Sequence, residues 1–439
     1  MSTDVIVVGG GFAGLGAATA LAERGLRVAV YEARPALGGR ASVFTDPVTG
    51  ERVDNGQHIV LGCYHETFRF LRRLGTDGAV ELQSKLTVDM IGQNGRTSRL
   101  SCPSLPAPFH LLAGALGWSA LTWRDRFALF HMREALLGSN PVPAARTVRE
   151  WLTGLRQTET LLEMLWEPLA VAALNQSVDV ASAKPFAEVL RRMFGADRSA
   201  SSLGLFRKPL DEVFAVPSQA FIEARGGQVR TKTPARILTS GNDLRVLVRD
   251  EEHRVRAIVC AVPWFALRDA FPDAPPVLEA VLANADATAA SPIVTVNLWL
   301  DRPVTGAVFI GLPGRTMQWV FDKHSIFGAE ASHLSMISSG AETLAGDSND
   351  AIVALALDEL RAALPAAREA TVRRAVVVRE KRSTFSVAPN QPPRPGVRTG
   401  IPGVFLAGDW IDTGLPATIE SAVVSGHMAA DAVTHSLDL

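Results

Sequence analysis

A glycine-rich turn near the start of the chain restricts the possible fold more than any other feature. Gly9, Gly11 and Gly14 stand between a β-branched apolar run, Asp4–Val8, and a segment of helical periodicity, Leu15–Arg24. In a strand–turn–helix unit the first glycine permits a sharp turn, and the second lets the backbone approach a pyrophosphate. The third lets helix and strand pack closely. The first amides and the dipole of the helix favour phosphate at the same place.

A second strand is expected at Leu26–Glu32, which would complete a β-α-β unit of a parallel sheet. It ends in Glu32, 18 residues after Gly14. A carboxylate at this position accepts hydrogen bonds from ribose hydroxyls, whereas a 2′-phosphate requires a basic residue. The segment therefore predicts a site for NAD or FAD rather than NADP. A glycine turn that binds no ligand is the alternative.

The remaining chain alternates between helical and strand-rich segments. Residues 85–205 are mostly helical by period, including Phe127–Leu137, and strands return after 228, with a hairpin turn at Gly241-Asn242. A last buried strand, Val404–Ala407, precedes a terminal helix, Thr418–Thr434. We expect an α/β fold in which a Rossmann-like domain with a parallel sheet is interrupted by a mixed α+β substrate domain with a helical insert. The first domain would comprise residues 1–85, 206–270 and 390–439, and the second residues 86–205 and 271–389.

Composition narrows the class of protein. The 439 residues are 47% hydrophobic and 20% charged, with a formal net charge of −1, so we expect a globular chain without a nucleic-acid partner. The three cysteines, Cys63, Cys102 and Cys260, are far apart and form no CxxC, so we expect no disulfide framework and no metal site. No signal peptide or membrane-spanning segment is evident. A reducing, cytoplasmic setting is expected.

Three further motifs extend the N-terminal fingerprint: Gly38-Gly39-Arg40, Asp54-Asn55-Gly56-Gln57-His58 and Phe405-Leu406-Ala407-Gly408-Asp409-Trp410. Together they resemble the flavin amine oxidase and phytoene desaturase superfamily. The resemblance implies that Arg40 reaches the phosphate region and that Asp409 holds the pyrophosphate and ribitol of FAD. Since no cysteine follows Cys260, non-covalent FAD is expected. The fingerprint and the resemblance predict cofactor contacts at Gly9, Gly11, Phe12, Ala13, Gly14, Glu32, Ala33, Gly38, Gly39, Arg40, Gly56, Gln57, His58, Ala235, Gly408, Asp409, Thr418, Ile419 and Ala422.

The chain departs from the amine oxidases where those enzymes surround the flavin with aromatic side chains. It has only two tyrosines, Tyr31 and Tyr64, and Thr418 stands where the late cage tyrosine would fall. The expected strand Ile293–Leu300 lacks the lysine that many amine oxidases place near the flavin. Amine oxidation is therefore not expected.

Other segments resemble one subgroup, the squalene-associated FAD-dependent desaturases, which are hydroxysqualene dehydroxylases of bacterial hopanoid synthesis. These segments are Leu61-Gly62-Cys63-Tyr64, Trp166-Glu167-Pro168-Leu169, Leu174-Asn175, Phe214-Ala215-Val216-Pro217 and Gly414-Leu415-Pro416-Ala417-Thr418. The resemblance implies FAD-dependent removal of the allylic hydroxyl of hydroxysqualene to give squalene. It implies substrate contacts at Trp166, Leu169, Asn175, Leu415 and Pro416. A desaturase of the carotenoid type and a non-catalytic flavoprotein that binds prenyl lipids are the alternatives, and no second nucleotide fingerprint identifies an electron donor.

Two side chains are candidates for the acid that such a reaction needs. His58 has a suitable ordinary pKa, although it could instead hydrogen-bond the cofactor or a backbone carbonyl. Glu167 lies on an apolar helical face where burial would keep it protonated, although it could instead pair with an arginine at a helix end. Glu420 is expected to cap a helix or contact the flavin region, with a catalytic role as the alternative.

The segment 105–123 is a candidate for peripheral membrane contact on the inner face of the membrane. Its apolar residues are followed by Trp123, Arg124 and Arg126, a pattern typical of interfacial helices. An ordinary core helix of the substrate domain is the alternative interpretation.

Overall fold

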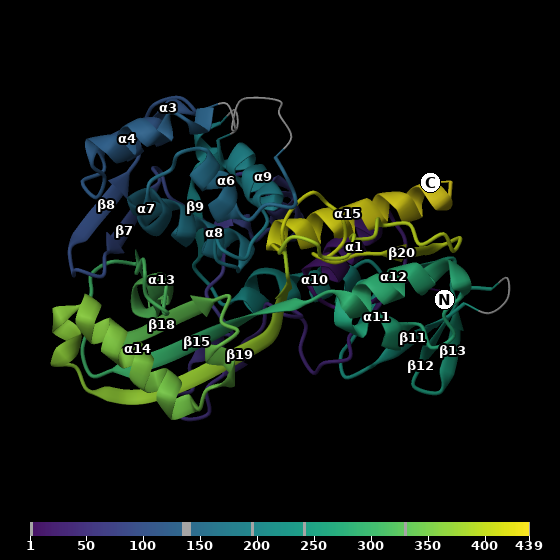
Figure 1. Ribbon diagram of the computed structural model, residues 1–439. Coiled ribbons are helices and arrows are strands. Elements are labelled where there is room, and N and C mark those ends of the chain that lie inside the picture. The colour runs from purple at the N-terminus through teal and green to yellow at the C-terminus, as the bar shows by residue number, and fades with distance from the viewer. Residues whose placement is uncertain (1–2, 134–141, 195–196, 240–242, 329–331, 439) are drawn as a thin grey trace.

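The computed structural model describes residues 3–133, 142–194, 197–239, 243–328 and 332–438. Figure 1 shows two large bodies, one built around a parallel sheet and one around a long mixed sheet with helices above it. The α/β fold class predicted from the sequence is confirmed.

The first body contains a five-stranded parallel sheet in the order β10-β2-β1-β14-β20. Its central strands are continuous apolar runs because a parallel sheet is covered on both faces. Two long helices, α1 (Phe12–Glu23) and α15 (Ile419–Ser436), lie side by side against it (Figure 1). The strands are β1 (Val5–Val8), β2 (Val28–Tyr31), β10 (Gln228–Arg230), β14 (Ala257–Cys260) and β20 (Val404–Leu406).

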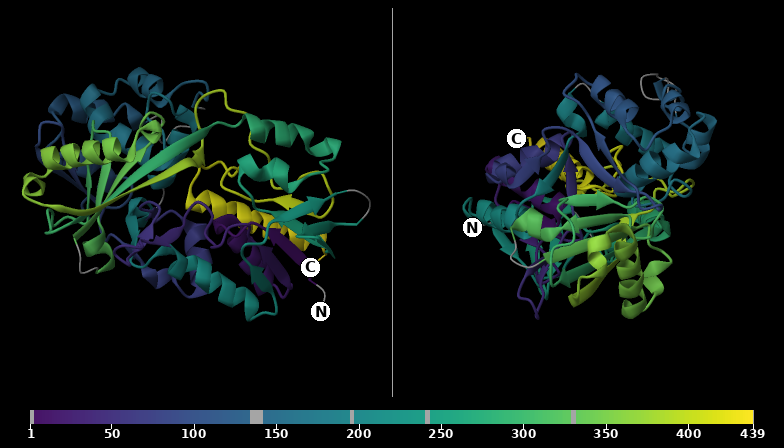
Figure 2. Two further views of the ribbon diagram at one scale, coloured as in Figure 1. Left: turned by 90° about the horizontal axis from the view of Figure 1, so that it is seen from below. Right: turned by 90° about the vertical axis from the view of Figure 1, so that its left-hand side faces the viewer.

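The second body contains a seven-stranded mixed sheet in the order β19-β15-β18-β17-β16-β7-β8. Helix α14 (Asn349–Ala363) covers one face of this sheet, as Figure 1 and Figure 2 show, and builds an apolar core with it. The opposite face turns toward the first body. The strands are β7 (Thr87–Ile91), β8 (Thr97–Ser101), β15 (Ala290–Leu300), β16 (Phe309–Gly311), β17 (Trp319–Asp322), β18 (Ser332–Ser339) and β19 (Val372–Phe385).

A helical insert lies above the hairpin of β7 and β8 (Figure 1). Thr122 and Thr147 form capping boxes that fix where α4 and α6 begin. The predicted helix Phe127–Leu137 instead begins at Trp123, and its last four predicted residues, 134–137, lie outside the described residues. The helices are α3 (Phe109–Gly117), α4 (Trp123–Leu129), α6 (Val148–Gly154), α7 (Glu159–Leu161), a π-helical turn (Leu162–Trp166), α8 (Glu167–Leu174) and α9 (Ala183–Met193).

Shorter elements complete the structure, and three of them, β11, β12 and β13, form a small sheet at the side of the first body that is remote from the second (Figure 1). Strands β11 and β12 pair antiparallel as predicted, and β13 adds a third strand that the sequence did not predict. The hairpin turn predicted at Gly241-Asn242 lies outside the described residues. These elements are β3 (Val43–Thr45), β4 (Arg52–Asp54), β5 (Ile59–Leu61), α2 (His65–Leu74), β6 (Val80–Leu82), β9 (Leu203–Phe206), α10 (Val216–Glu223), β11 (Ala235–Leu238), β12 (Arg245–Val248), β13 (Glu251–Arg254), α11 (Leu267–Ala270), α12 (Pro276–Ala287) and α13 (Lys323–Phe327).

Candidate functional site

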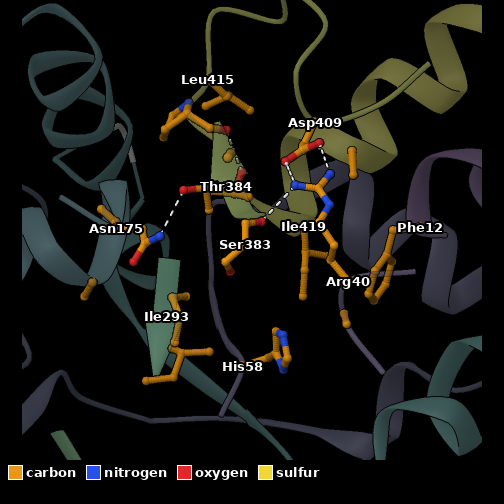
Figure 3. Close-up of a pocket in the computed structure, with 18 of the residues that line it drawn as sticks. Phe12, Arg40, His58, Asn175, Ile293, Ser383, Thr384, Asp409, Leu415 and Ile419 are labelled. Atoms are coloured by element: carbon orange, nitrogen blue, oxygen red, sulfur yellow. Dashed lines mark hydrogen bonds and ion pairs between the residues drawn. The ribbon is translucent and has the colours of Figure 1, made fainter. Parts of the chain in front are cut away.

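A cavity of about 1950 Å³ extends from the glycine-rich turn to the helical insert. Its walls come from the carboxyl ends of β1 and β2, the first turn of α15, the inward face of the seven-stranded sheet and helices α3, α8 and α9. Figure 3 shows Phe12, Arg40, His58, Asn175 and Leu415 around this space, although they come from segments far apart in the chain.

The structure gathers nearly all the residues selected from the sequence around this one cavity. Every predicted cofactor residue except Gly14 lines it, and so does every predicted substrate residue. His58 lines it as well, whereas Glu167 is not among its lining residues.

The glycine-rich turn has room for a phosphate. A Cβ atom on Gly11 would meet nothing closer than the Cα atom of Gly39 at 3.8 Å, so the missing side chain leaves open space. Gly11 is also the N-cap of α1 and supplies no side-chain cap, so the first amides of the helix are available to a ligand. Gly14 has the packing role predicted for it, because a Cβ there would lie 2.0 Å from the oxygen of Gly9.

Glu32 is fixed at the end of β2. Its carboxylate accepts hydrogen bonds from the amides of Gly10 and Arg34, both at 2.7 Å, and it still lines the cavity. A carboxylate has about four acceptor positions, so ribose hydroxyls could still bind it. This arrangement fits a nucleoside at this end of the cavity, with Ala235 of β11 among the other lining residues.

Arg40 and Asp409 form an ion pair across 369 residues of sequence. The guanidinium donates two hydrogen bonds to the carboxylate, one of them at 3.0 Å, and a third to the carbonyl of Ser383 at 2.8 Å (Figure 3). It also lies 5.2 Å from the ring of Trp264. The ion pair links the early Gly-Gly-Arg motif to the late Gly-Asp motif, and it fixes both predicted cofactor residues at the cavity wall.

The N-terminus of α15 faces the cavity through Thr418, Ile419 and Ala422. Thr418 is the N-cap and accepts a hydrogen bond from the amide of Ser421 at 3.1 Å. Glu420 points elsewhere: its carboxylate accepts hydrogen bonds from the amides of Glu66 at 3.0 Å and Thr67 at 2.8 Å. It therefore caps α2, and it is not among the cavity-lining residues.

His58 stands on the cavity wall next to a buried ion pair. The Nζ atom of Lys323 lies 3.6 Å from Asp54 and donates a hydrogen bond of 2.5 Å to Gln57. Burial lowers the pKa of His58, with Asp54 opposing and Lys323 adding to the effect. The Nδ1 atom of the imidazole is buried and makes no hydrogen bond within the part of the chain that the structure describes.

The side chain of Glu167 forms a hydrogen bond within the helical insert. Its carboxylate accepts a hydrogen bond of 2.8 Å from the amide of Val178, and burial raises its pKa. The raised pKa agrees with the reasoning from sequence. However, Glu167 is not among the lining residues, although its neighbours Trp166 and Pro168 are, so of the two candidate acids only His58 lines the cavity.

The predicted substrate residues line the far part of the cavity in different ways. Asn175 ends α8 in a left-handed conformation, and its side-chain amide bonds Ser291, Thr384 and Gly340 at 2.9–3.0 Å. These bonds make it a link between α8 and the seven-stranded sheet. The remaining four, Trp166, Leu169, Leu415 and Pro416, contribute apolar surface.

Some lining residues could not have been selected from the sequence. Tyr64 presents its hydroxyl to Thr418, and burial raises the pKa of this phenol. Trp319 and Phe321 of β17 face the cavity because alternate residues of a strand share a face. Lys323, two residues after Phe321 on α13, is buried although it is not among the lining residues, and nothing in its local sequence indicated this burial.

The geometry of the site agrees with comparisons with known proteins. The sequence model of one family, described as flavin containing amine oxidoreductase, matches residues 12–434. The chain belongs to this family. A protein named hydroxysqualene dehydroxylase from Rhodopseudomonas palustris is 30% identical over 99% of both chains. A 15-cis-phytoene desaturase from Synechococcus elongatus is 25% identical over 98% of this chain and 95% of its own.

Solved structures share the fold. An oxidoreductase from Methanosarcina mazei has a TM-score of 0.76 and 17% identity, covering 98% of this chain and all of its own. Cyclohexylamine oxidase from Brevibacterium oxydans has a TM-score of 0.71 and 19% identity, covering 100% of both chains. The protein is an FAD-dependent oxidoreductase, as the fingerprint and the paired motifs predicted.

Proposed function

We propose that this flavoprotein removes the allylic hydroxyl of hydroxysqualene reductively and so forms squalene. The observation that carries the proposal is the cavity, which joins the dinucleotide turn, His58 and an apolar chamber in one space. Its volume of about 1950 Å³ exceeds the roughly 300–1,000 Å³ of ordinary ligand pockets, which suits a cofactor together with a large substrate. The curated relatives named hydroxysqualene dehydroxylase, at 28–30% identity over almost the whole chain, support it.

The apolar chamber suits a long hydrocarbon. The hairpin of β7 and β8 contributes Val88, Met90 and Leu100, and α3 and α9 contribute Leu112 and Met193. Burial of hydrocarbon stabilises binding by about 0.8 kcal/mol for each CH₂ group. A chamber with few polar groups therefore selects an isoprenoid over a charged amine, and this agrees with the missing aromatic cage.

The reaction needs a proton, a hydride and exclusion of water. Protonation of the hydroxyl lets it leave as water, and the resulting allylic cation accepts a hydride. In the overall balance, R–OH, H⁺ and H⁻ become R–H and H₂O. Bound FAD, when reduced, supplies the hydride. His58 supplies the proton, and the aromatic rings of Trp319 and Phe321 line the cavity where a cation would be stabilised by their faces.

Product analysis tests the proposal. Photoreduced holoenzyme is incubated anaerobically with hydroxysqualene, and we expect squalene to form in step with reoxidation of the flavin. Two outcomes contradict the proposal. Oxidised enzyme that takes hydride from a phytoene-like polyene, without turnover of hydroxysqualene, indicates a carotenoid-type desaturase. Tight binding of hydroxysqualene without either reaction indicates a non-catalytic prenyl-lipid-binding flavoprotein.

The same proposal places the mouth of the cavity against an anionic membrane surface. Phe109 and Phe130 both line the cavity and are 60% and 52% exposed, so the cavity opens between α3 and the end of α4. Beside them, Trp123 is 72% and Phe127 67% exposed, and Arg126 stacks on Trp123 at 4.8 Å. Aromatic side chains next to arginines are typical of surfaces that lie in the lipid headgroup region. No described helix is long and apolar enough to span a bilayer.

The double variant Trp123→Ser/Phe127→Ser is expected to bind vesicles of phosphatidylcholine and phosphatidylglycerol at least tenfold more weakly than wild type in flotation. Both side chains are exposed, so folding should be retained. Deletion of the segment would be less informative, because Trp118 and Leu121 are 1% and 4% exposed and belong to the core. Val48→Ser is a matched control, since Val48 is 68% exposed on a distant turn. Equal flotation of all three proteins would remove the membrane surface from the proposal.

A further inference from the structure

The seven-stranded sheet buries a line of polar side chains on the face that carries the cavity wall. The register pairs Asn297 of β15 with Ser335 of β18, and Trp299 with His333, so each pair shares a face. Thr295 lies on that face two residues before Asn297. Thr295, Asn297 and Ser335 are fully buried and His333 is 2% exposed. We call Thr295, Asn297, Ser335 and His333 the polar stripe.

Several atoms of the polar stripe are unsatisfied by protein. Thr295 Oγ1, Asn297 Nδ2 and Ser335 Oγ are buried and have no hydrogen-bond partner in the described parts of the chain, and His58 Nδ1 shares this property. Buried polar atoms in proteins nearly always bond protein or ordered water. Alternate residues of a strand lie about 7 Å apart, and a chain of two waters, each hydrogen bond about 2.8 Å long, covers such a span. Ordered water along the polar stripe would satisfy all three side chains.

The inner end of the polar stripe meets the cavity. A Cβ atom on Gly56 would lie 3.6 Å from Thr295 Oγ1, and Gly56 lines the cavity two residues before His58. Ile337, directly opposite Thr295 in the register, also lines the cavity. Thr295 therefore lies directly behind the segment of the cavity wall that contains Gly56 and, two residues later, His58.

The outer end reaches a carboxylate at the surface. His333 contacts Asn297 Oδ1 through Nε2 at 3.0 Å, and its Nδ1 atom lies 3.3 Å from the carboxylate of Glu51. The side chain of Glu51 is 26% exposed, so it can exchange protons with solvent. Burial lowers the pKa of His333, and the neighbouring carboxylate of Glu51 opposes this effect.

The charged groups beside the polar stripe are already paired. Lys323 is 1% and Asp54 3% exposed, and they form an ion pair, while Lys323 also donates a hydrogen bond to Gln57. The hydroxyls of Thr295 and Ser335, with water between them, are then the groups that can pass a proton. The amide of Asn297 neither gains nor loses a proton readily and serves to orient the water.

We propose that the polar stripe is a hydrated path that carries protons from Glu51 and His333 to His58. This inference rests on the proposed function, in which each turnover consumes one proton from solvent. The proton enters at the carboxylate, passes to His58 and leaves the protein in the water formed from the substrate hydroxyl. No further oxidant or reductant is involved, because the hydride comes from the reduced cofactor.

Two conservative variants test the path against a matched control. Thr295→Val and Ser335→Ala each remove a hydroxyl that bonds no described residue, so a purely structural role predicts melting temperatures equal to or above wild type. Ser338→Ala is the control, because Ser338 is 2% exposed on the same strand but on the opposite face. In single turnovers of photoreduced holoenzyme with hydroxysqualene, Thr295→Val and Ser335→Ala should react at least tenfold more slowly, with a larger solvent isotope effect. Rates equal to that of Ser338→Ala would overturn the proposal.

A second measurement does not depend on the substrate. A crystal structure of the wild-type holoenzyme at a resolution that shows ordered water should place water within hydrogen-bond distance of Thr295 Oγ1, Asn297 Nδ2 and Ser335 Oγ. A dry polar stripe would overturn the inference. If wild type fails to convert hydroxysqualene, the proposed function fails, while the presence or absence of this water still decides whether the path exists.

Discussion

Replacing Gly11 by valine is expected to abolish FAD binding while leaving the apoprotein folded. Gly11 has φ −85°, which any residue can adopt, and its added Cβ would meet no atom closer than 3.8 Å. The isopropyl group would instead enter the cavity in front of the first amides of α1, where a phosphate must lie. We expect affinity for FAD to fall at least 100-fold, or about 2.7 kcal/mol. Titration of the apoprotein with FAD measures this loss, and circular dichroism measures the fold.

Valine substitutions at two other glycines serve as comparisons for Gly11→Val. Gly14→Val should destabilise the fold itself by about 3 kcal/mol, because a Cβ there would lie 2.0 Å from the oxygen of Gly9. Gly306→Val should change neither property, because nothing lies within 4 Å of its added Cβ. If Gly11→Val binds FAD as wild type does, the phosphate lies elsewhere and the assignment of this turn is wrong.

The sequence predicted the cofactor half of the site well because the glycine fingerprint links backbone geometry to chemistry within a few residues. Gly9 has φ +108°, and the spacing to Glu32 depends only on the length of one helix and one strand. The boundary of α1 was less accurate. The helix begins at Phe12 rather than at Leu15, because Gly11 acts as its N-cap and the turn is shorter than the motif.

Features that depend on long-range packing could not be predicted. The hairpin of β7 and β8 lies within a segment that is mostly helical, and it joins the seven-stranded sheet through β16, a parallel neighbour more than 200 residues away. Glu420 was expected to cap a helix or contact the flavin region, and only the structure shows that its carboxylate caps α2, more than 350 residues away. The buried pair of Lys323 and Asp54 is likewise visible only once the sheet and the β4 segment meet.

The two candidate acids, His58 and Glu167, show that a proton donor needs both a suitable pKa and a position on the cavity wall. The interpretation of Glu167 relied on burial, and that of His58 on its ordinary pKa. Burial raises the pKa of Glu167, as expected, and lowers that of His58. Sequence periodicity placed Glu167 on an apolar face, but it could not show that this face packs against the amide of Val178 rather than the cavity. The structure therefore distinguishes the two candidates by position, because His58 lines the cavity and Glu167 does not.

Replacing His58 by alanine is expected to slow the single turnover of hydroxysqualene by photoreduced enzyme by a factor of about 10²–10⁴, the usual contribution of a general acid. Glu167→Gln should react at the wild-type rate, because its carboxylate lies outside the cavity wall. Measuring the FAD content of His58→Ala distinguishes a role of His58 as the acid from a role as a ligand of the cofactor. A variant that loses FAD, but reacts at the wild-type rate per bound flavin, would make His58 a cofactor ligand rather than the acid.

The pH dependence gives a second criterion for the same residue. The donor must be protonated, and burial places the pKa of His58 below its ordinary value of about 6.5. The wild-type rate should therefore fall as pH rises through that lowered pKa, and His58→Ala should lose this limb of the profile. At neutral pH most of the imidazole is then neutral, so turnover depends on how quickly a proton reaches it. A limb that persists in His58→Ala would show that another group supplies the proton.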